Sequence, residues 1–207
     1  MFRLHGFFTQ NSRKPLYVLS ELGVDFEFNF VNLMAGEQRT DEFLQMNPLG
    51  KVPVLDHDGQ YLAESGAICR YVANVCESEL YPADKMQRAK VDQWLDYFSC
   101  HLGRWFTTLY FQNIIKPKAN LGEPDQQSID EATKFIGQQM KYLDSHLAES
   151  DWLANDSLSI ADICALAYVE QSRDVGVSLD PYPNVSEWFD RLDKRESIAK
   201  ARALLPT

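Results

Sequence analysis

The sequence predicts an α/β domain of order βαβαββα followed by an all-α domain. Three observations support this fold class. Strand-like and helix-like segments alternate over residues 1–77, a polar segment with a proline interrupts the pattern at 78–85, and only helical periodicity follows over 86–207. Alternating strands and helices are typical of a sheet covered by helices, whereas helices alone form a bundle. We therefore expect domains at 1–77 and 86–207, joined by a linker at 78–85.

The first domain is predicted to begin with a βαβ unit. Residues 2–7 and 25–32 are the expected strands, the second with strict alternation of polar and apolar residues, and 13–22 between them has helical spacing. The two strands of such a unit run parallel. Four further segments complete the order: a short helix at 40–46, strands at 52–55 and 60–63, and a helix at 65–75.

The second domain is predicted to pack amphipathic helices around an apolar one. Apolar residues recur at helical spacing over 91–109, and again over 128–147 after a loop that contains Pro117 and Pro124. Residues 163–169 are apolar nearly all round, which is typical of a helix at the centre of a domain.

Ser159 and Asp162 predict how that central helix begins. In a capping box the serine hydroxyl accepts a first-turn N–H, here that of Asp162, and the acid accepts the N–H of the serine. Leu158 and Ile163 can pack on each other as a hydrophobic staple. We expect a structural role for this motif and no catalytic one.

The composition indicates a folded chain with an acidic surface. Of the 207 residues 45% are hydrophobic, and the formal net charge is −10. This charge offers no basic surface to nucleic acid, and no apolar run approaches the roughly 18 residues needed to cross a bilayer. Residues 1–8 are too few and too polar for a signal peptide. We expect a cytoplasmic protein with neither nucleic acid nor a membrane as partner.

The cysteines and histidines do not form a metal-binding pattern. The chain has 4 cysteines and 4 histidines, all widely spaced, and lacks a Cys-x-x-Cys pair. We expect no metal site and four free thiols buried in helices.

The segment 50–55 predicts a strand end that binds a peptide. Val52 precedes a proline, so its backbone is extended, and Pro53 can hold a cis bond that leaves the Val52 N–H and C=O unpaired and pointing outward. A short antiparallel peptide can bond to such an end. Taken alone, an X-Pro pair is most often trans and marks no site.

Glu64 and Ser65 lie where the next helix should begin. The N–H groups and the positive dipole end of a helix N-terminus suit a carboxylate, although a serine there often serves only as a cap. Together with Val52, this pair predicts a ligand that is a short peptide with a free carboxylate.

In order and spacing these motifs resemble those of the cytosolic glutathione S-transferases, with theta-, phi- and nu-like bacterial members as the nearest types. The resemblance extends over essentially the whole chain and includes the segments Asn47-Pro48-Leu49-Gly50-Lys51 and Tyr182-Pro183-Asn184-Val185-Ser186-Glu187-Trp188. It implies a thioredoxin-like first domain, glutathione as co-substrate and a small hydrophobic electrophile as second substrate. It also implies a homodimer, formed through the helices at 65–75 and 91–109.

The resemblance implies six glutathione-binding residues: Gln38, Lys51, Val52, Pro53, Glu64 and Ser65. The Val52 backbone would pair with the cysteinyl part of glutathione, while Glu64 and Ser65 would hold the amine and carboxylate of the γ-glutamyl part. Gln38 and Lys51 would contact the glycyl end.

The resemblance also implies that the residue that activates the thiol follows the first strand. Counting back from Arg13, the position used by theta-, phi- and delta-like enzymes falls on Thr9, whose hydroxyl can donate a hydrogen bond to a thiolate. Thr9 with Asn11 also resembles the nu-class members, which are linked to glutathione-dependent disulfide reduction. Ser12 competes as activator, but we favour it as the N-cap of a helix with Pro15 in its first turn.

The electrophile pocket is expected in the helical domain. The face of the long helix that carries Arg104, Thr108 and Phe111 would hold the electrophile against Phe8. A mixed face of this kind is equally consistent with solvated surface.

Three functions remain open at this stage. The first is a glutathione transferase that acts on apolar electrophiles, and the second is a thiol–disulfide reductase, which Thr9 and Asn11 suggest. The third is a non-catalytic glutathione-binding protein, which the intact Glu64-Ser65 pair disfavours.

Overall fold

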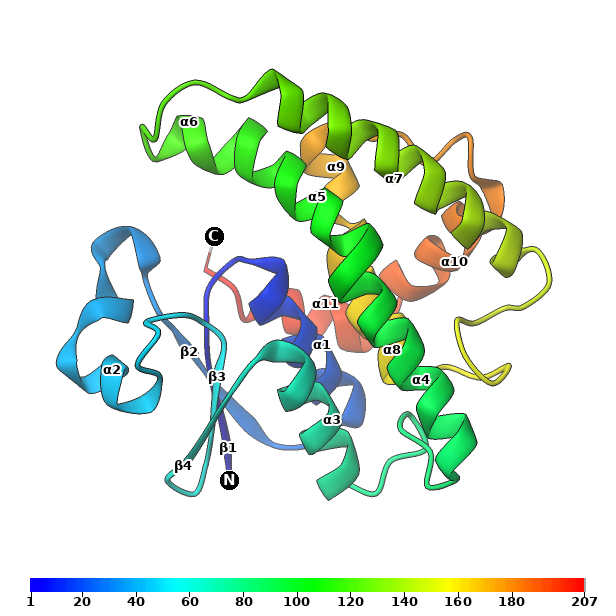
Figure 1. Cartoon of the computed structure of the whole chain (residues 1–207). Helices are drawn as coiled ribbons and strands as arrows, with labels where there is room; N and C mark the ends of the chain where they lie inside the picture. The colour runs from blue at the N-terminus through cyan, green and yellow to red at the C-terminus, as the bar shows by residue number, and fades with distance from the viewer. Residues whose placement is uncertain (207) are drawn as a thin grey trace. The chain divides into compact units, whose positions relative to one another are not determined.

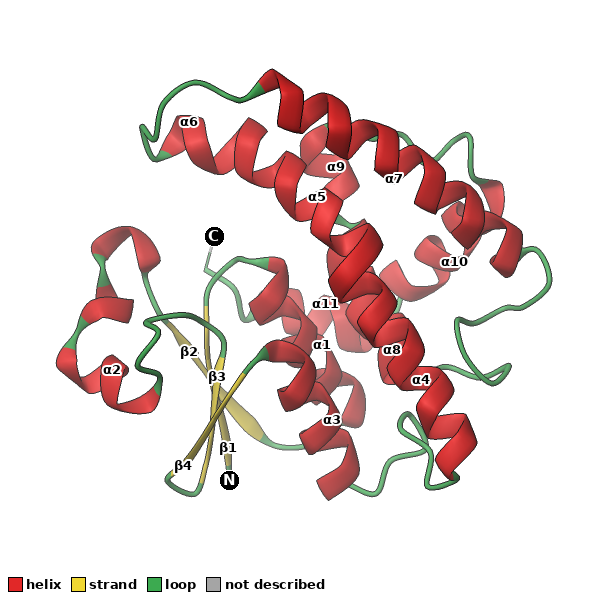
Figure 2. Ribbon diagram, in the orientation of Figure 1, coloured by secondary structure: helices red, strands yellow, loops and turns green. Residues whose placement is uncertain are grey.

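Four strands form one mixed sheet in the N-terminal part of the chain (Figure 1, Figure 2). In this computed structural model, which describes residues 1–206, the strand order is β2-β1-β3-β4. β1 (Phe2–Gly6) runs parallel to β2 (Phe26–Phe30) and antiparallel to β3 (Val54–His57), and β4 (Gln60–Ala63) lies at the edge. The predicted order βαβαββα is confirmed, with the third strand two residues later than expected.

Helices cover both faces of this sheet (Figure 2). α1 (Gln10–Leu22) and α3 (Ser65–Val75) pack together on one face, and α2 (Asp41–Met46) lies on the other. Leu4, Leu16 and Ile68 are completely buried. Burying each such side chain stabilises the fold by about 1.5–3 kcal/mol.

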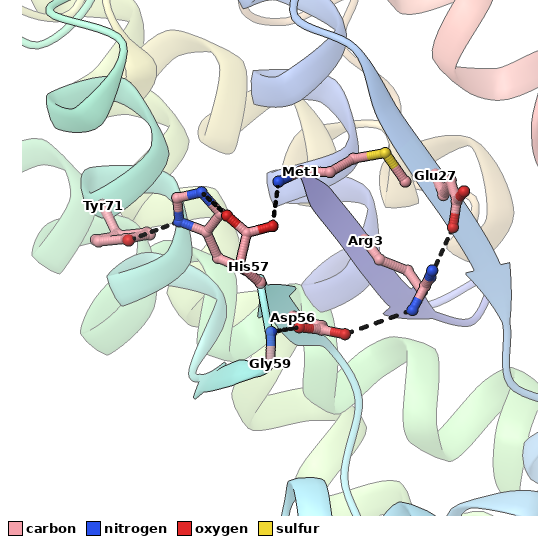
Figure 3. Close-up of polar contacts among 8 residues, drawn as sticks. Met1, Arg3, Glu27, Asp56, His57, Gly59 and Tyr71 are labelled. Atoms are coloured by element: carbon pink, nitrogen blue, oxygen red, sulfur yellow. Dashed lines mark hydrogen bonds and ion pairs between the residues drawn. The ribbon is translucent and has the colours of Figure 1, made fainter.

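A polar network holds the β3–β4 hairpin against its neighbours (Figure 3). The Arg3 guanidinium donates to Glu27 on β2 at 2.6 Å and to Asp56 on β3 at 3.5 Å. On α3 the Tyr71 hydroxyl lies 2.8 Å from Nδ1 of His57. The β3 residues in these contacts, Asp56 and His57, are the last two of the strand. The residues before β3 take no part in this network.

By contacts, the chain divides into two units. Unit 1 comprises Met1–Ala83 and the residues from Asp193 onward, and unit 2 comprises Asp84–Leu192. The predicted linker at 78–85 and the predicted helical domain at 86–207 refer to domains that fold independently. A division by contacts does not test independent folding, so both remain predictions.

The C-terminal helix α11 (Glu196–Ala203) packs on α1 within unit 1. The Glu21 carboxylate of α1 accepts two hydrogen bonds from Arg195, one of them at 2.9 Å, and a third from Ser197. Arg202 donates to the Tyr17 hydroxyl at 3.3 Å. A bidentate arginine–carboxylate pair of this kind fixes orientation as well as distance.

In unit 2 the predicted long helix is a run of five segments. α4 (Lys85–Tyr97), the π-helical turn η3 (Phe98–Leu102), α5 (Gly103–Tyr110), the π-helical turn η4 (Phe111–Ile115) and α6 (Lys116–Lys118) follow one another without a break. Gly103 packs against Tyr168, whose ring would lie 2.5 Å from a Cβ at residue 103. The π turn and the glycine therefore allow two helices to approach closely.

The other helices of unit 2 are α7 (Gln126–Leu147), α8 (Ile160–Val169), α9 (Gln171–Val175) and most of α10 (Pro183–Asp193). α8 is buried along its whole length, as its apolar sequence predicted. Among the residues that the structure describes, no helix combines the length and the hydropathy that a membrane span requires.

The predicted capping box opens α8. The Ser159 hydroxyl accepts the Ala161 N–H at 3.2 Å and donates to the Asp162 carboxylate at 2.9 Å, and the carboxylate also accepts the Ser159 N–H at 3.0 Å. Further donors reach Asp162 from the Leu153 N–H at 2.9 Å and the Trp188 indole at 3.0 Å. Burial raises the pKa of Asp162, and these donors act in the opposite direction.

Candidate functional site

A cleft of about 150 Å³ lies in unit 1. It is lined by Asn11, Lys51, Val52, Pro53, Glu64 and Ser65. Three backbone features meet there: the N-terminus of α1, the segment before β3 and the N-terminus of α3. Sequence reasoning singled out every one of these lining residues, while the cleft lining does not include Gln38, Thr9 or Ser12.

Val52 supplies a backbone edge to the cleft. The Val52–Pro53 peptide bond is cis, as the sequence suggested, and the β3 ladder begins only at Val54, opposite His5. Within residues 1–206, no hydrogen bond involves the Val52 N–H or C=O. A bound peptide strand can therefore pair with this residue.

Asn47 holds the loop that leads to Val52. Its side-chain amide donates to the Lys51 carbonyl at 2.8 Å, and its side-chain oxygen accepts the Leu49 N–H at 3.2 Å. Sequence reasoning assigned no role to Asn47, although an asparagine before Pro-Leu-Gly is a recognisable turn signal.

Gln38 is brought near the same loop by Gly50. A Cβ at residue 50 would lie 2.9 Å from the Gln38 carbonyl oxygen, and the φ of Gly50 is +59°. Only glycine fits this close approach. Among the described residues, the side-chain oxygen of Gln38 is buried and has no hydrogen-bond partner. A polar atom in this state needs a partner, which a ligand can provide.

Glu64 and Ser65 line the side of the cleft where α3 begins. α3 begins at buried Ser65, and no side chain of Glu64 caps its first turn. The N-terminus of α3 therefore offers N–H groups and a positive dipole end to the cleft. Glu64 has φ +68° and ψ +111°, which costs a non-glycine residue about 1–3 kcal/mol. Backbone strain of this size is typical of functional positions.

The start of α1 differs from the prediction at Ser12. The N-cap is Thr9, whose carbonyl accepts the N–H groups of Ser12 and Arg13 at 3.0 Å each. Ser12 is the third residue of the helix, and Pro15 lies beyond the first turn. The prediction of Ser12 as N-cap is therefore wrong, because its hydroxyl instead accepts the N–H of Phe7 at 3.0 Å.

The hydroxyl groups of Thr9 and Ser12 lie next to each other. Their oxygen atoms are 3.3 Å apart, and Thr9 makes no side-chain capping hydrogen bond. Because Ser12 is completely buried, its hydroxyl is out of reach of a ligand in the cleft, whereas Asn11 lines the cleft itself.

The four residues of the predicted electrophile pocket belong to different units. In unit 1, the Phe8 ring packs on Phe30 with centroids 5.0 Å apart. In unit 2, the Arg104 guanidinium lies over the Trp105 ring, the Thr108 hydroxyl donates to the Arg104 carbonyl at 3.1 Å, and Phe111 is exposed. Their assembly into one pocket stays a prediction.

The four cysteines are free, but only two of them are buried. Cys69 and Cys164 are buried, Cys76 is partly exposed and Cys100 is exposed, so the expectation of four buried thiols is wrong. Cys100 lies in the π-helical turn η3, and its side chain is exposed although the sequence around it has helical apolar spacing. In the part of the chain that the structure describes, no cluster of His, Cys, Asp and Glu could hold a metal ion.

Family models match both halves of the chain. One described as "Glutathione S-transferase, N-terminal domain" matches residues 2–74, and one described as "Glutathione S-transferase, C-terminal domain" matches residues 99–196. Glutathione S-transferase 1 from Zea mays is 32% identical over 195 residues, which cover 90% of this chain and 88% of that protein.

Solved structures agree with these matches. Glutathione transferase F7 from Populus trichocarpa superposes with a TM-score of 0.91 at 26% identity and 100% coverage of both chains. Glutathione S-transferase-I bound with the ligand lactoylglutathione superposes with a TM-score of 0.89 at 30% identity and 99% coverage of both chains.

Proposed function

Because this chain belongs to the glutathione S-transferase family and joins the glutathione thiol to electrophiles, we propose that Thr9 is the donor that stabilises the thiolate. The observation that carries this proposal is the cleft of unit 1, which unites an unpaired backbone edge with the N-termini of α1 and α3. The alternatives of a disulfide reductase and of a non-catalytic binding protein are not favoured, because the relatives are named transferases.

The cleft suits each part of glutathione. In the proposed complex the cysteinyl part pairs with the Val52 backbone, and the γ-glutamyl carboxylate lies at the N-terminus of α3 beside Ser65. The Glu64 carboxylate faces the ammonium group, and a charge-assisted hydrogen bond there contributes about 1.5–3 kcal/mol. Lys51 and Gln38 contact the glycyl end, where the glycyl N–H donates to the buried side-chain oxygen of Gln38 and the Lys51 ammonium faces the carboxylate.

The thiol then lies at the start of α1. A free thiol has a pKa of about 8.5, so only a few per cent is ionised at neutral pH. Lowering that pKa by about two units requires roughly 2.7 kcal/mol. One hydrogen bond from the Thr9 hydroxyl supplies about 1.5–3 kcal/mol, and the α1 dipole adds about 0.3–1 kcal/mol. No general base is needed, and Asn11 serves as a second donor at the cleft wall.

The second substrate is proposed to be a small apolar electrophile, with Phe8 of unit 1 and Arg104, Thr108 and Phe111 of unit 2 as the residues that contact it. The thiolate sulfur forms a bond to the electrophilic carbon, and the electron pair of the broken bond leaves with the departing group. The phenyl ring of Phe111 is exposed and therefore available to contact an apolar electrophile.

We also propose a homodimer in the cytoplasm. Exposed Tyr61 on β4 and Val75 on α3 supply apolar surface for a partner subunit, and four free thiols suit a reducing compartment. Sedimentation at micromolar concentration tests the dimer, and a monomer would contradict it. Cell fractionation tests the location.

Thr9→Val tests the activator. It removes the hydroxyl and keeps the branched shape, whereas the control Thr9→Ser keeps the hydroxyl. We expect Thr9→Val to raise the pKa of bound glutathione, measured from thiolate absorbance, and to lower kcat/KM for an aryl halide about 100-fold. Thr9→Ser should retain most activity. An unchanged thiol pKa in Thr9→Val would show that Thr9 is not the activator, and the same titration of Asn11→Ala would then identify the alternative donor.

A further inference from the structure

We propose that Ser12 is a positioning residue, which acts through Thr9 by fixing the direction of the Thr9 hydroxyl proton. This inference rests on the proposed role of Thr9 as activator. Ser12 does not cap α1, because the helix begins before it. Ser12 also does not contact the thiol, because it is fully buried.

Three polar groups form a continuous chain from the end of β1 to the helix start. The Phe7 N–H donates to the Ser12 hydroxyl oxygen at 3.0 Å, and that oxygen lies 3.3 Å from the hydroxyl oxygen of Thr9. Either hydroxyl could be the donor between Ser12 and Thr9 on distance alone.

The count of protons and acceptors selects one direction. If Thr9 donated to Ser12, the Ser12 proton would need another acceptor, and neither solvent nor any other group in residues 1–206 provides one. A buried donor without a partner loses its hydration and gains no hydrogen bond in return, which disfavours this direction. If Ser12 donates to Thr9, both Ser12 bonds are satisfied and the Thr9 proton is free. The Thr9 proton then has the thiolate as its acceptor, and a bond to an anion is roughly twice as strong as a neutral one.

Gly6 gives Ser12 the room to occupy this position. A Cβ at residue 6 would lie 3.0 Å from the Ser12 Cβ and 2.9 Å from the ring of Phe28. The absence of a side chain at Gly6 therefore lets the first turn of α1 approach the end of β1. Since Ser12 is enclosed there, its hydroxyl is held in one orientation.

The chain should also strengthen the bond to the thiolate. Hydrogen bonds in series polarise one another by about 10–30% per bond in a low-dielectric environment. If the Thr9 hydrogen bond lowers the thiol pKa by about two, a strengthening of that bond by this fraction lowers the thiol pKa by about a further 0.5.

A double-mutant cycle tests the inference in the full-length protein with bound glutathione. Ser12→Ala, Thr9→Val and the double variant are titrated by thiolate absorbance. We expect Ser12→Ala to raise the thiol pKa by about 0.5 in the parent and to leave it unchanged in the Thr9→Val background. The matched control is Ser20→Ala, which removes another α1 hydroxyl, one that donates to the Ser197 carbonyl at 2.7 Å. It should change the melting temperature and not the thiol pKa.

The outcomes separate the two proposals. If Thr9→Val raises the thiol pKa and Ser12→Ala does not, the positioning role is overturned and Thr9 remains the activator. Equal increments from Ser12→Ala in both backgrounds would likewise overturn it, because Ser12 would then act independently of Thr9. If Thr9→Val has no effect, both proposals fail. Should Ser12→Ala not fold, Ser12→Cys preserves the side-chain size with a weak hydrogen-bonding group and is expected to give the same result.

Discussion

The helices α1 and α8 begin with the same arrangement and use it in opposite ways. Each has a hydroxyl residue at the N-cap and a polar residue three positions later, Thr9 with Ser12 and Ser159 with Asp162. At α8 the capping groups bond to the helix and to one another, and the site is closed. At α1 no side chain caps the first turn.

The difference shows what a binding helix terminus requires. A helix terminus whose amides are satisfied by its own side chains has nothing left for a ligand. The missing cap at α1, worth about 1 kcal/mol, therefore agrees with the anion site that we propose there. α3 follows α1 in this respect, since Glu64 also makes no capping hydrogen bond. Unit 1 therefore keeps two helix starts open, while unit 2 is stabilised by one that is closed.

Breaking the closed terminus should have the largest effect. Asp162→Ala removes the acceptor of four hydrogen bonds, so we expect the free energy of unfolding to fall by roughly 3 kcal/mol or more, measured by urea denaturation. Asp162→Asn is the matched control, which keeps the shape, replaces one acceptor by an NH₂ group and should lose less. Unchanged unfolding in Asp162→Ala would contradict the role of this carboxylate.

Breaking the open terminus should instead affect chemistry. Thr9→Val is expected to lower the free energy of unfolding by only about 1 kcal/mol, because the Thr9 hydroxyl caps no amide and its removal costs only the acceptor of the buried Ser12 hydroxyl. Its effect on the barrier should be about 2–3 kcal/mol, the usual result of removing one donor to a developing or bound anion. A Thr9→Val variant with parent-like conjugation rates and a loss of stability as large as that of Asp162→Ala would reverse the contrast between the two termini.

Relaxing the strained residue of α3 should separate stability from binding. Glu64→Gly relieves the strain of a non-glycine residue at φ +68°, but glycine also makes the unfolded chain more flexible, which offsets part of the gain. The net result expected in thermal unfolding is a protein more stable by about 0.5–1 kcal/mol. Glutathione affinity, measured by calorimetry, should fall about tenfold because a charged partner is lost.

Glu64→Gln is the control for that change. It keeps the strained backbone and removes the charge, so it should weaken glutathione binding without the gain in stability. If Glu64→Gln and Glu64→Gly had the same melting temperature, the backbone strain would carry no free energy.

The smallest expected effect concerns pH and His5 on β1. Burial lowers the pKa of His5, and its Nε2 is a buried atom without a partner among the described residues. In the unfolded chain His5 takes up a proton at about pH 6.5, whereas in the folded protein its lowered pKa delays protonation to a lower pH. Protonation therefore favours the unfolded chain, so the folded protein keeps its full stability above about pH 6.5 and loses part of it as the pH falls below that value.

His5→Leu should therefore flatten the fall in melting temperature between about pH 6.5 and 5. Leu4→Val, which changes a buried residue of the same strand that carries no titratable group, is the matched control and should keep the slope of the parent. If the melting temperature of His5→Leu fell with pH as steeply as that of the parent, the pH dependence would come from other groups.

Local motifs made much of this molecule predictable. The capping box of α8 depends on residues within four positions of one another, and the Val52–Pro53 and Glu64–Ser65 pairs lie at the ends of elements whose periodicity is clear. These pairs meet in one cleft because β3 and α3 belong to the same small unit.

The beginning of α1 could not be predicted in the same way. Thr9 and Ser12 are both good N-caps by residue type, and the choice between them depends on the Phe7 N–H and on the space at Gly6. These are contacts with the end of a strand, which a helix-start rule does not contain. The pairing of Glu21 with Arg195 is equally hidden, because 174 positions separate the two residues.

The pairing of α11 with α1 sets an order on biosynthesis. α11 follows unit 2 in the chain, so it leaves the ribosome only after every helix of unit 2 has been made. Until then, the Glu21 carboxylate lacks its guanidinium partner, and the side of α1 that packs on α11 is uncovered. A translation product that stops before residue 193 therefore has every residue that lines the cleft but lacks the helix that packs on α1.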